Sequence, residues 1–436
     1  CKSITLKGYE MHTERKQIAA GTFLTVIPAD KFKSNYIQIR FVMPLKKETA
    51  AKNSLVFPVI LRGTEKYPTL ADIRRRKQEL YASGIWSGHW KHGDNHIVTL
   101  EASSMRNSYA IDDTDITGGV LDLIGQAVLH PVTENGVFKA ESVEGEKKIA
   151  ADTVRATINQ KGRYARLKAI EEMFSGDAYG ISDGGTVEEI EAVCPKCLFE
   201  AYKNMLRTAR IEIFAVGDFD GNELEKKFSE IFSSVERDGI YEPIPDTKGT
   251  ARAEIQKIYD RQNVTQGVLV LGFFTDSVTS DDDYAVTKVF NTVFGGSAAS
   301  KLFMNVREKL SLCYYCSSSL IPEKGAMTVA SGIQFENEQK AFDEIMLQLD
   351  NMKNGEITDD EIEMAKKSLC DDIMSADDSV RALAATAFGE VMYGRKLTDD
   401  EKIAKINAVT KEQITERAKA VRLDTYYFLC GQEESK

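Results

Sequence analysis

Cysteine, tryptophan and long apolar runs are scarce in this chain, and each scarcity excludes a class of protein. The 436 residues include 7 cysteines and 2 tryptophans. So thin a spread of cysteines is unlike a secreted domain held by disulfides, and it favours a reducing cytoplasm. The longest apolar runs, such as 55–61 and 267–274, fall far short of the roughly 18 residues that a membrane-spanning helix needs. We therefore expect a cytoplasmic protein with no membrane partner.

Net positive charge and the common nucleotide and hydrolase motifs are also missing. The formal net charge is −11, whereas a general nucleic-acid binder needs basic surface to release counterions. The sequence has no Gly-x-x-x-x-Gly-Lys-Ser/Thr and no Gly-x-Gly-x-x-Gly loop, and no Gly-x-Ser-x-Gly elbow. These absences argue against a nucleic-acid partner, a phosphate-bearing cofactor and serine-hydrolase chemistry.

What the chain does contain is an ordinary globular composition arranged as mixed strands and helices. Hydrophobic residues make up 42% and charged residues 28%, and the length suggests two or perhaps three domains. Apolar periodicity predicts strands at 35–44, 85–103 (a hairpin turning at Gly93-Asp94), 211–216, 255–259, 267–274, 314–320, 326–333 and 425–430. It predicts helices at 69–83, 119–174, 195–208, 222–232, 283–294 and 299–310, and again after the strand 326–333 almost to the closing strand.

Similar segments recur at a nearly constant offset, which indicates that the chain is a duplicated unit. Residues 190–194 lead through a helix into the strand ending at Gly217, and residues 406–410 lead through a helix into the strand ending at Gly431. The proline- and glycine-bearing stretch 236–252 lies between the halves and is typical of a linker. We therefore predict an N-terminal domain at 1–235 and a homologous C-terminal domain at 253–436, each with its own sheet and helical layer.

Two Cys-x-x-Cys pairs and a histidine cluster are the candidate metal ligands. Cys194/Cys197 and Cys313/Cys316 lie in different halves, so free structural thiols are favoured over a four-thiolate zinc site. The repeat aligns Cys194 with Thr410 at a helix N-cap, with Pro195 at the first helical position.

Three of the five histidines, His89, His92 and His96, cluster on the predicted hairpin. Because side chains alternate along a strand, His89 and His92 should point to opposite faces unless a bulge intervenes. The cluster lacks an adjacent glutamate base, so a partly exposed hairpin is favoured over an adventitious or regulatory metal site.

Motifs in both halves resemble the pitrilysin/insulinase superfamily of zinc peptidases. Residues 57–68 (Phe-Pro-Val-Ile-Leu-Arg-Gly-Thr-Glu-Lys-Tyr-Pro) are similar to the segment that follows the zinc helix in that superfamily. Residues 294–297 (Phe-Gly-Gly-Ser), 300–303 (Ser-Lys-Leu-Phe) and 306–314 resemble its second-domain motif. The resemblance covers nearly the whole chain. It implies an α+β fold of two homologous domains, each a mostly antiparallel β-sheet with a helical layer, as in processing-peptidase subunits.

The same resemblance places the zinc-site positions on residues that do not bind zinc. Aligned on Arg62-Gly63-Thr64, the motif His-x-x-Glu-His falls on Ser54, Phe57 and Pro58, and the third ligand falls on Thr153. Serine is a poor zinc ligand, and neither proline nor phenylalanine can ligate a metal or act as a general base. Only Glu146 still matches an acidic position of the second ligand helix. We therefore expect no metal and no catalysis in this chain alone.

Arg307 and Tyr314 keep the seven-residue spacing of a pair that, in the superfamily, helps to bind substrate and stabilise the transition state. An arginine fork can hold a peptide carbonyl or carboxylate, and a tyrosine hydroxyl can donate to a developing oxyanion. The alternative is that Arg307 only caps its helix and Tyr314 only packs in the sheet.

The resemblance implies a non-catalytic, peptide-binding subunit that completes the active site of a homologous zinc-bearing partner through Arg307 and Tyr314. Zinc would then be held by the partner and no cofactor by this chain. One alternative is a purely structural or binding homologue, like the cytochrome bc-complex core subunits. Another is an independent metalloenzyme that uses His89, His92 and His96. A homodimer of this chain in the absence of its partner is also left open.

Overall fold

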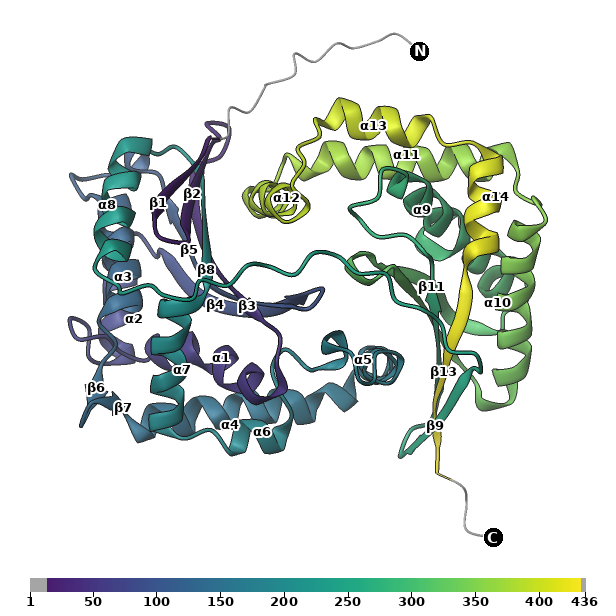
Figure 1. Ribbon diagram of the computed structural model, residues 1–436, viewed down its shortest axis with the longest axis horizontal. Helices are drawn as coiled ribbons and strands as arrows, with labels where there is room; N and C mark the ends of the chain where they lie inside the picture. The colour runs from purple at the N-terminus through teal and green to yellow at the C-terminus, as the bar shows by residue number, and fades with distance from the viewer. Residues whose placement is uncertain (1–13, 433–436) are drawn as a thin grey trace.

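The computed structural model describes residues 14–432 and contains two large β-sheets, each with its own layer of helices (Figure 1). The first half consists of β1 (Glu14–Ala19), β2 (Thr22–Pro28), β3 (Ser34–Pro44), α1 (Lys47–Ile60), α2 (Leu70–Glu79), β4 (Gly84–His92), β5 (Asn95–Met105), α3 (Ile116–Leu129), β6 (Thr133–Glu134), β7 (Val137–Phe138), α4 (Ala140–Ala156), α5 (Lys161–Met173), α6 (Val187–Glu191), α7 (Pro195–Thr208), β8 (Arg210–Gly217) and α8 (Gly221–Ser233).

The second half repeats the plan of the first. It consists of β9 (Gln256–Gln262), β10 (Gly267–Phe274), α9 (Tyr284–Asn291), the π-helical segments η4 (Thr292–Gly296) and η5 (Leu302–Lys309), β11 (Cys313–Ile321), β12 (Ala326–Ile333), α10 (Glu338–Lys353), α11 (Asp359–Ala376), α12 (Val380–Tyr393), α13 (Asp399–Asn407), α14 (Lys411–Ala420) and β13 (Arg422–Gly431). Short 3-10 turns join several of these elements.

The two sheets have the same strand order, which confirms the predicted fold of two homologous, mostly antiparallel sheets. The first sheet runs β1-β2-β8-β3-β5-β4 and the second β9-β13-β10-β12-β11. Leaving out β1, the strands correspond one to one. In both sheets the closing strand pairs in parallel with the entry strand, β8 with β2 and β13 with β9, while the other pairs are antiparallel.

The repeat also governs how the corresponding helices begin. Cys194 is the N-cap of α7 and Thr410 the N-cap of α14, and each forms a reciprocal capping box with the third residue of its helix. Such a box satisfies two of the backbone N–H groups that a helix start leaves without intrahelical partners. The alignment of Cys194 with Thr410 predicted from sequence is therefore confirmed.

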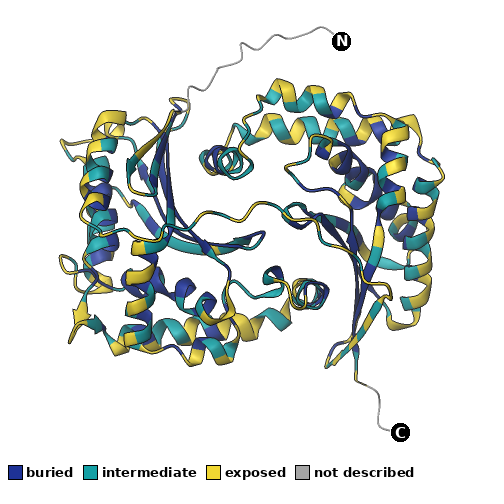
Figure 2. Ribbon diagram, viewed as in Figure 1, coloured by how far each residue is buried: buried dark blue, intermediate teal, exposed yellow. Residues whose placement is uncertain are grey.

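The central strands of both sheets, β3, β5 and β8 in the first and β10, β12 and β13 in the second, are buried because helices cover both faces of each sheet (Figure 2). On the outer side of the first sheet, α1, α3 and α7 pack against β3 and β5. On the inner side of the same sheet lies α12 from the second half, whose Phe388 contacts Phe214 of β8. Conversely, Ala165 and Ala169 of α5 pack against the inner face of the second sheet. One helix of each half therefore packs against the inner face of the other half's sheet.

The segment 236–252 carries neither helix nor strand, and hydrogen bonds tie it to both halves. The amide of Ile244 donates to Asn95 Oδ1 (2.8 Å), and the amide of Thr247 donates to the carbonyl of Glu323 (3.0 Å). The predicted domain limits, 1–235 and 253–436 with 236–252 between them, remain our interpretation of where the repeated units meet.

Two features of the first half differ from the sequence expectation. The region 119–174, expected to be helical, contains the two-stranded hairpin β6–β7 between α3 and α4, with Asn135 and Gly136 at positive φ in its turn. Strands β1 and β2 precede the first strand that the apolar periodicity predicts, at 35–44. Within residues 14–432, no helix combines the length and apolar character that crossing a bilayer demands.

Candidate functional site

The positions of the lost zinc motif lie on α1, where Phe57 belongs to the hydrophobic core, Ser54 is buried beside it and Pro58 is half-buried. The Phe57 ring is fully buried and lies 5.0 Å from the ring of Phe41 on β3. Ser54 is buried, and its hydroxyl donates to the carbonyl of Ala51 (2.9 Å). Pro58 stands inside the helix, where its missing N–H removes one backbone hydrogen bond. These side chains satisfy the core of the domain and offer no metal ligand.

The fourth position, Thr153, lies on the exposed side of α4, where its hydroxyl donates back to the carbonyl of Ile149 (2.8 Å). Glu146, seven residues before Thr153 on α4, forms an ion pair with Arg62, whose Nε donates to Glu146 Oε1 at 2.6 Å. The residues present therefore do not fit a zinc ion. Among the described residues, no group of three or more histidine, cysteine or acidic side chains is arranged to hold a metal.

The structure divides the histidine cluster in two. His89 and His96 lie together on one face of the hairpin, with ring centroids 6.4 Å apart. His96 is fully buried, and burial lowers its pKa to about 4. His92 lies on the other face, where it contacts Phe388 and its Nδ1 is 3.3 Å from Glu323 Oε1. The predicted opposite orientation of His89 and His92 is thus what the hairpin shows, and the three imidazoles do not converge on one point.

Cys194 and Cys197 form the start of α7 rather than part of a site shared with the other cysteine pair. The amide of Cys197 donates to Cys194 Sγ at 3.1 Å, and the amide of Cys194 donates to Cys197 Sγ at 2.8 Å. The two thiols therefore serve the backbone of their own helix. Cys313 and Cys316 lie in the second sheet, on β11.

Arg307 occupies the π-helical segment η5, which packs beside β11. Its guanidinium lies over the ring of Phe303, 4.6 Å from the ring centroid, and its Nε is 3.6 Å from Glu308 Oε1. The side chain is 41% exposed. The stacked ring orients the guanidinium, while the exposure leaves its donors within reach of a molecule in solution.

Tyr314 is the extra residue of a β-bulge at the start of β11. Its neighbours Cys313 and Tyr315 pair with Ile333 and Gly332 of β12, whereas Tyr314 itself has no partner in the register. The residue is 56% exposed, and its hydroxyl accepts a hydrogen bond from Gln334 Nε2 (2.8 Å). A bulge redirects a side chain away from the sheet, so the tyrosine projects from an edge strand rather than packing within it.

Gln334 lies on the same exposed surface as Arg307 and Tyr314, and the sequence interpretation missed it. It follows β12 directly and is distant in sequence from Arg307. No local motif marks it, because its contact with Tyr314 arises only when β11 and β12 pair.

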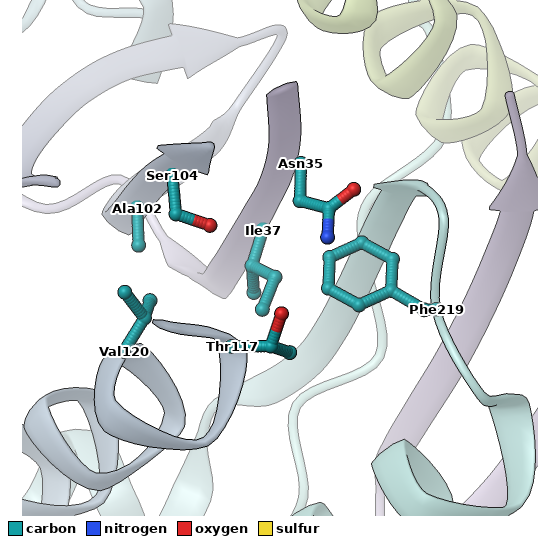
Figure 3. A pocket seen from close by; sticks show the side chains of 7 residues that line it. All are labelled: Asn35, Ile37, Ala102, Ser104, Thr117, Val120 and Phe219. Atoms are coloured by element: carbon teal, nitrogen blue, oxygen red, sulfur yellow. The ribbon is translucent and has the colours of Figure 1, made fainter. Parts of the chain in front are cut away.

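A small hollow in the first half is lined mainly by apolar side chains (Figure 3). It lies between β3, β5, α3 and Phe219, and its polar residues are Asn35, Ser104 and Thr117. The side-chain amide of Asn35 is engaged on both sides by the backbone of Asp218 (3.0 and 2.9 Å). With no charged residue in its lining, this hollow lacks the groups that acid–base or metal chemistry needs.

Comparison with known proteins relates the chain to peptidases. The family described as "Peptidase M16 inactive domain" matches residues 196–369. The "Probable inactive metalloprotease YmfF" of Bacillus subtilis is 30% identical over 420 residues, which cover 96% of this chain and 98% of that protein. The "Uncharacterized zinc protease YmxG" of the same bacterium is 23% identical over 314 residues, 70% of this chain and 73% of that protein.

A solved structure has nearly the same fold over nearly the whole length. It is that of a conserved protein from Enterococcus faecalis V583, which is 30% identical to this chain. The TM-score is 0.91, and the match covers 97% of this chain and 100% of the other. The two-domain architecture is therefore shared across the full chain.

Proposed function

Because this chain belongs to the M16 peptidase family and is a homologue of its inactive members, we propose that it is a peptide-binding, non-catalytic subunit of a zinc peptidase. In this proposal a homologous subunit with an intact His-x-x-Glu-His motif holds the zinc. Arg307 and Tyr314 of this chain complete that subunit's active site. The zinc would supply Lewis-acid activation of water on the partner, and this chain would bind and orient the peptide.

The observation that carries the proposal is the contrast between the two halves. The zinc positions Ser54 and Phe57 are buried and Pro58 is half-buried within α1, whereas Arg307 and Tyr314 are exposed at one edge of the second sheet. Side chains of these types at the first place leave this chain without zinc ligands. Exposure of a cation and a phenol at the second place supports binding to a molecule outside the chain.

Peptide binding is supported by sheet edges that pair with no further strand within residues 14–432. β11 and β4 are the last strands of their sheets, and an edge strand presents unpaired N–H and C=O groups to which an extended peptide can add. Arg307 would hold a peptide carbonyl or carboxylate beside β11, and the Tyr314 hydroxyl would donate to the negative charge that develops on the peptide carbonyl oxygen.

The second candidate is a purely structural or binding homologue with no role in proteolysis. It is favoured by the name of the relative YmfF, a probable inactive metalloprotease. In that case the chain would associate with other proteins, and no combination of subunits would cleave a peptide. The cytoplasmic location and the possible homodimer remain predictions that belong to both candidates.

The test is peptidase activity of this chain alone and mixed with a zinc-motif homologue from the same genome, using fluorescein-labelled casein. We expect cleavage only in the mixture, with zinc found on the partner. In that mixture Arg307→Ala and Tyr314→Phe should each lower kcat, by about 100-fold where a transition-state donor is lost.

Matched controls are Arg75→Ala on α2, whose side chain is 70% exposed, and Tyr259→Phe on β9, the opposite edge of the same sheet, which is 49% exposed. Neither should change kcat. A mixture that stays fully active with both Arg307 and Tyr314 replaced would exclude the composite site. A mixture that never cleaves, although the subunits associate, would favour the structural candidate.

A further inference from the structure

The two cysteines that flank Tyr314 lie on the same face of the second sheet, which a regular strand would not allow. Cys313 pairs with Ile333 and Cys316 with Ser331 of β12. Because Ile333 and Ser331 are two residues apart, their side chains point to one face, and so do those of the two cysteines opposite them. In a strand without the bulge, residues three apart would point to opposite faces.

The bulge also shortens the distance between the two cysteines. Three regular strand residues span about 10 Å, but here the cysteines face two steps of β12, which is about 6.7 Å. A disulfide joins Cα atoms that are about 4.4–6.8 Å apart. The extra residue, Tyr314, thus brings the pair to the upper end of the range in which a disulfide forms.

The two thiols differ in environment in the way that thiol exchange requires. Cys316 is 2% exposed and packs in the core of the second half, whereas Cys313 is partly exposed. The side-chain hydrogen bond with Cys316 lowers the pKa of Cys313; burial opposes this shift, and the nearby Arg307 guanidinium makes the smallest contribution to the lowering. The same hydrogen bond, together with burial, raises the pKa of Cys316. The greater exposure of Cys313, together with its lowered pKa, favours Cys313 as the attacking thiolate and Cys316 as the resolving thiol.

We propose that Cys313 and Cys316 form a dithiol–disulfide couple that reshapes the bulge carrying Tyr314, so that oxidation controls the Arg307–Tyr314 surface. The oxidant is a low-molecular-weight disulfide. The Cys313 thiolate attacks one of its sulfurs, which forms a mixed disulfide and releases one thiol. Cys316 then loses its proton and attacks the Cys313 sulfur, which releases the second thiol. The two cysteines lose two electrons, and the reagent gains them as two thiols.

The disulfide acts on Tyr314 because this residue lies between the two bonded positions. Since the Cα atoms start at the wide end of the permitted range, closing the bond draws the bulge together. The Tyr314 hydroxyl then moves relative to Gln334 Nε2, its partner at 2.8 Å in the reduced chain. The control of peptide binding rests on the function proposed above; the disulfide itself does not.

The first experiment identifies the bond in the full-length chain. The protein is incubated with glutathione disulfide, free thiols are alkylated, and the tryptic peptide 310–324, which holds both cysteines, is weighed. We expect it to lose two hydrogens and to carry no alkyl group, and to accept two alkyl groups after reduction. The Cys316→Ser variant should instead keep glutathione on Cys313. Alkylation of both cysteines in the treated wild type, or a persistent glutathione adduct there, would overturn the proposal.

The second experiment measures the consequence. Backbone amides of β11 should exchange with deuterium more slowly in the oxidised chain, and labelled casein should bind it about tenfold more weakly, a difference of ~1.4 kcal/mol. Reductant should restore both, and Cys316→Ser should show neither. A disulfide that forms without altering exchange at β11 would refute the control of this surface. Absence of casein binding in both states, with the disulfide and slower exchange present, would instead refute the proposed function.

Discussion

At the scale of the residue, Asp246 is a carboxyl group whose ionisation is disfavoured by its surroundings. It lies in the segment between the two sheets, half-buried, and its Oδ2 has no hydrogen-bond partner among the described residues. Burial raises its pKa to about 6; nearby Glu323 adds to the shift and His92 opposes it. The folded chain therefore holds the protonated form more readily than the unfolded chain does.

This shift predicts how stability depends on pH at one residue. A raised carboxyl pKa contributes stability that is present below the unfolded pKa, near 4, and is lost as the pH rises through about 6. Asp246→Asn should therefore stabilise the fold at pH 7.5, by on the order of 1–2 kcal/mol after allowing for partial exposure. At pH 4 the difference should vanish. Urea unfolding of both proteins at the two pH values checks this, and equal stability at pH 7.5 would contradict it.

At the scale of the element, α5 and α12 each complete the core of the other half. Arg40 of β3, buried in the first sheet, lies 4.2 Å from the ring centroid of Phe388 on α12, and its Nη2 donates to the carbonyl of Ala384 (3.4 Å). The inner face of the first sheet is therefore covered by α12, a helix that lies in the second half of the sequence. The two halves should lose their structure together.

Phe388→Ala tests this exchange of helices. Phe388 is 4% exposed, and truncating a buried phenylalanine costs about 3–5 kcal/mol. The chain's only tryptophans, Trp86 and Trp90, lie on β4 of the first half. Unfolding followed by tryptophan fluorescence should therefore shift to lower urea although the substitution lies in the second half. The control Met374→Ala, at a residue 56% exposed on α11, should stay within about 0.5 kcal/mol of wild type.

At the scale of the whole molecule, one buried lysine joins the halves where their hairpins meet. Lys324 is 1% exposed, and its Nζ lies 3.0 Å from an oxygen of Asp94, 3.0 Å from one of Asp177 and 2.8 Å from Thr247 Oγ1. Two of these partners belong to the first half and the third to the connecting segment. The ammonium thus fixes the second half, from which it comes, against the other two parts.

Lys324→Met should destabilise the molecule strongly. Removing one partner of a buried ion pair leaves uncompensated charge and costs about 3–5 kcal/mol; here the uncompensated charge falls mainly on Asp94, because the Asp177 side chain is 41% exposed. Lys16→Met, which breaks an exposed pair with Glu225, should cost less than about 1 kcal/mol. The additional changes Asp94→Asn and Asp177→Asn should restore part of the stability in the lysine variant. A loss no larger than that of Lys16→Met would contradict the role given to Lys324.

Much of this architecture could be read from the sequence because local chemistry specifies it. Apolar periodicity predicts β10 and β12 with their observed limits. The N-cap at Cys194, followed by Pro195 at the first helical position, predicts the start of α7. The recurrence of similar segments 216 and 214 residues apart predicts two sheets with the same strand order. The identities of Ser54, Phe57 and Pro58 exclude zinc ligation in any fold, because ligation depends on side-chain atoms that these residues lack.

Only the tertiary structure decided which distant groups meet. The exchange of α5 and α12, the lysine between the two hairpins and the contact of Gln334 with Tyr314 join residues with no shared local pattern. The bulge that places Cys313 and Cys316 on one face depends on the register of β11 against β12, which is a property of pairing. Periodicity determines which face of a helix or strand is apolar, whereas the packing of the whole chain determines which other elements cover that face.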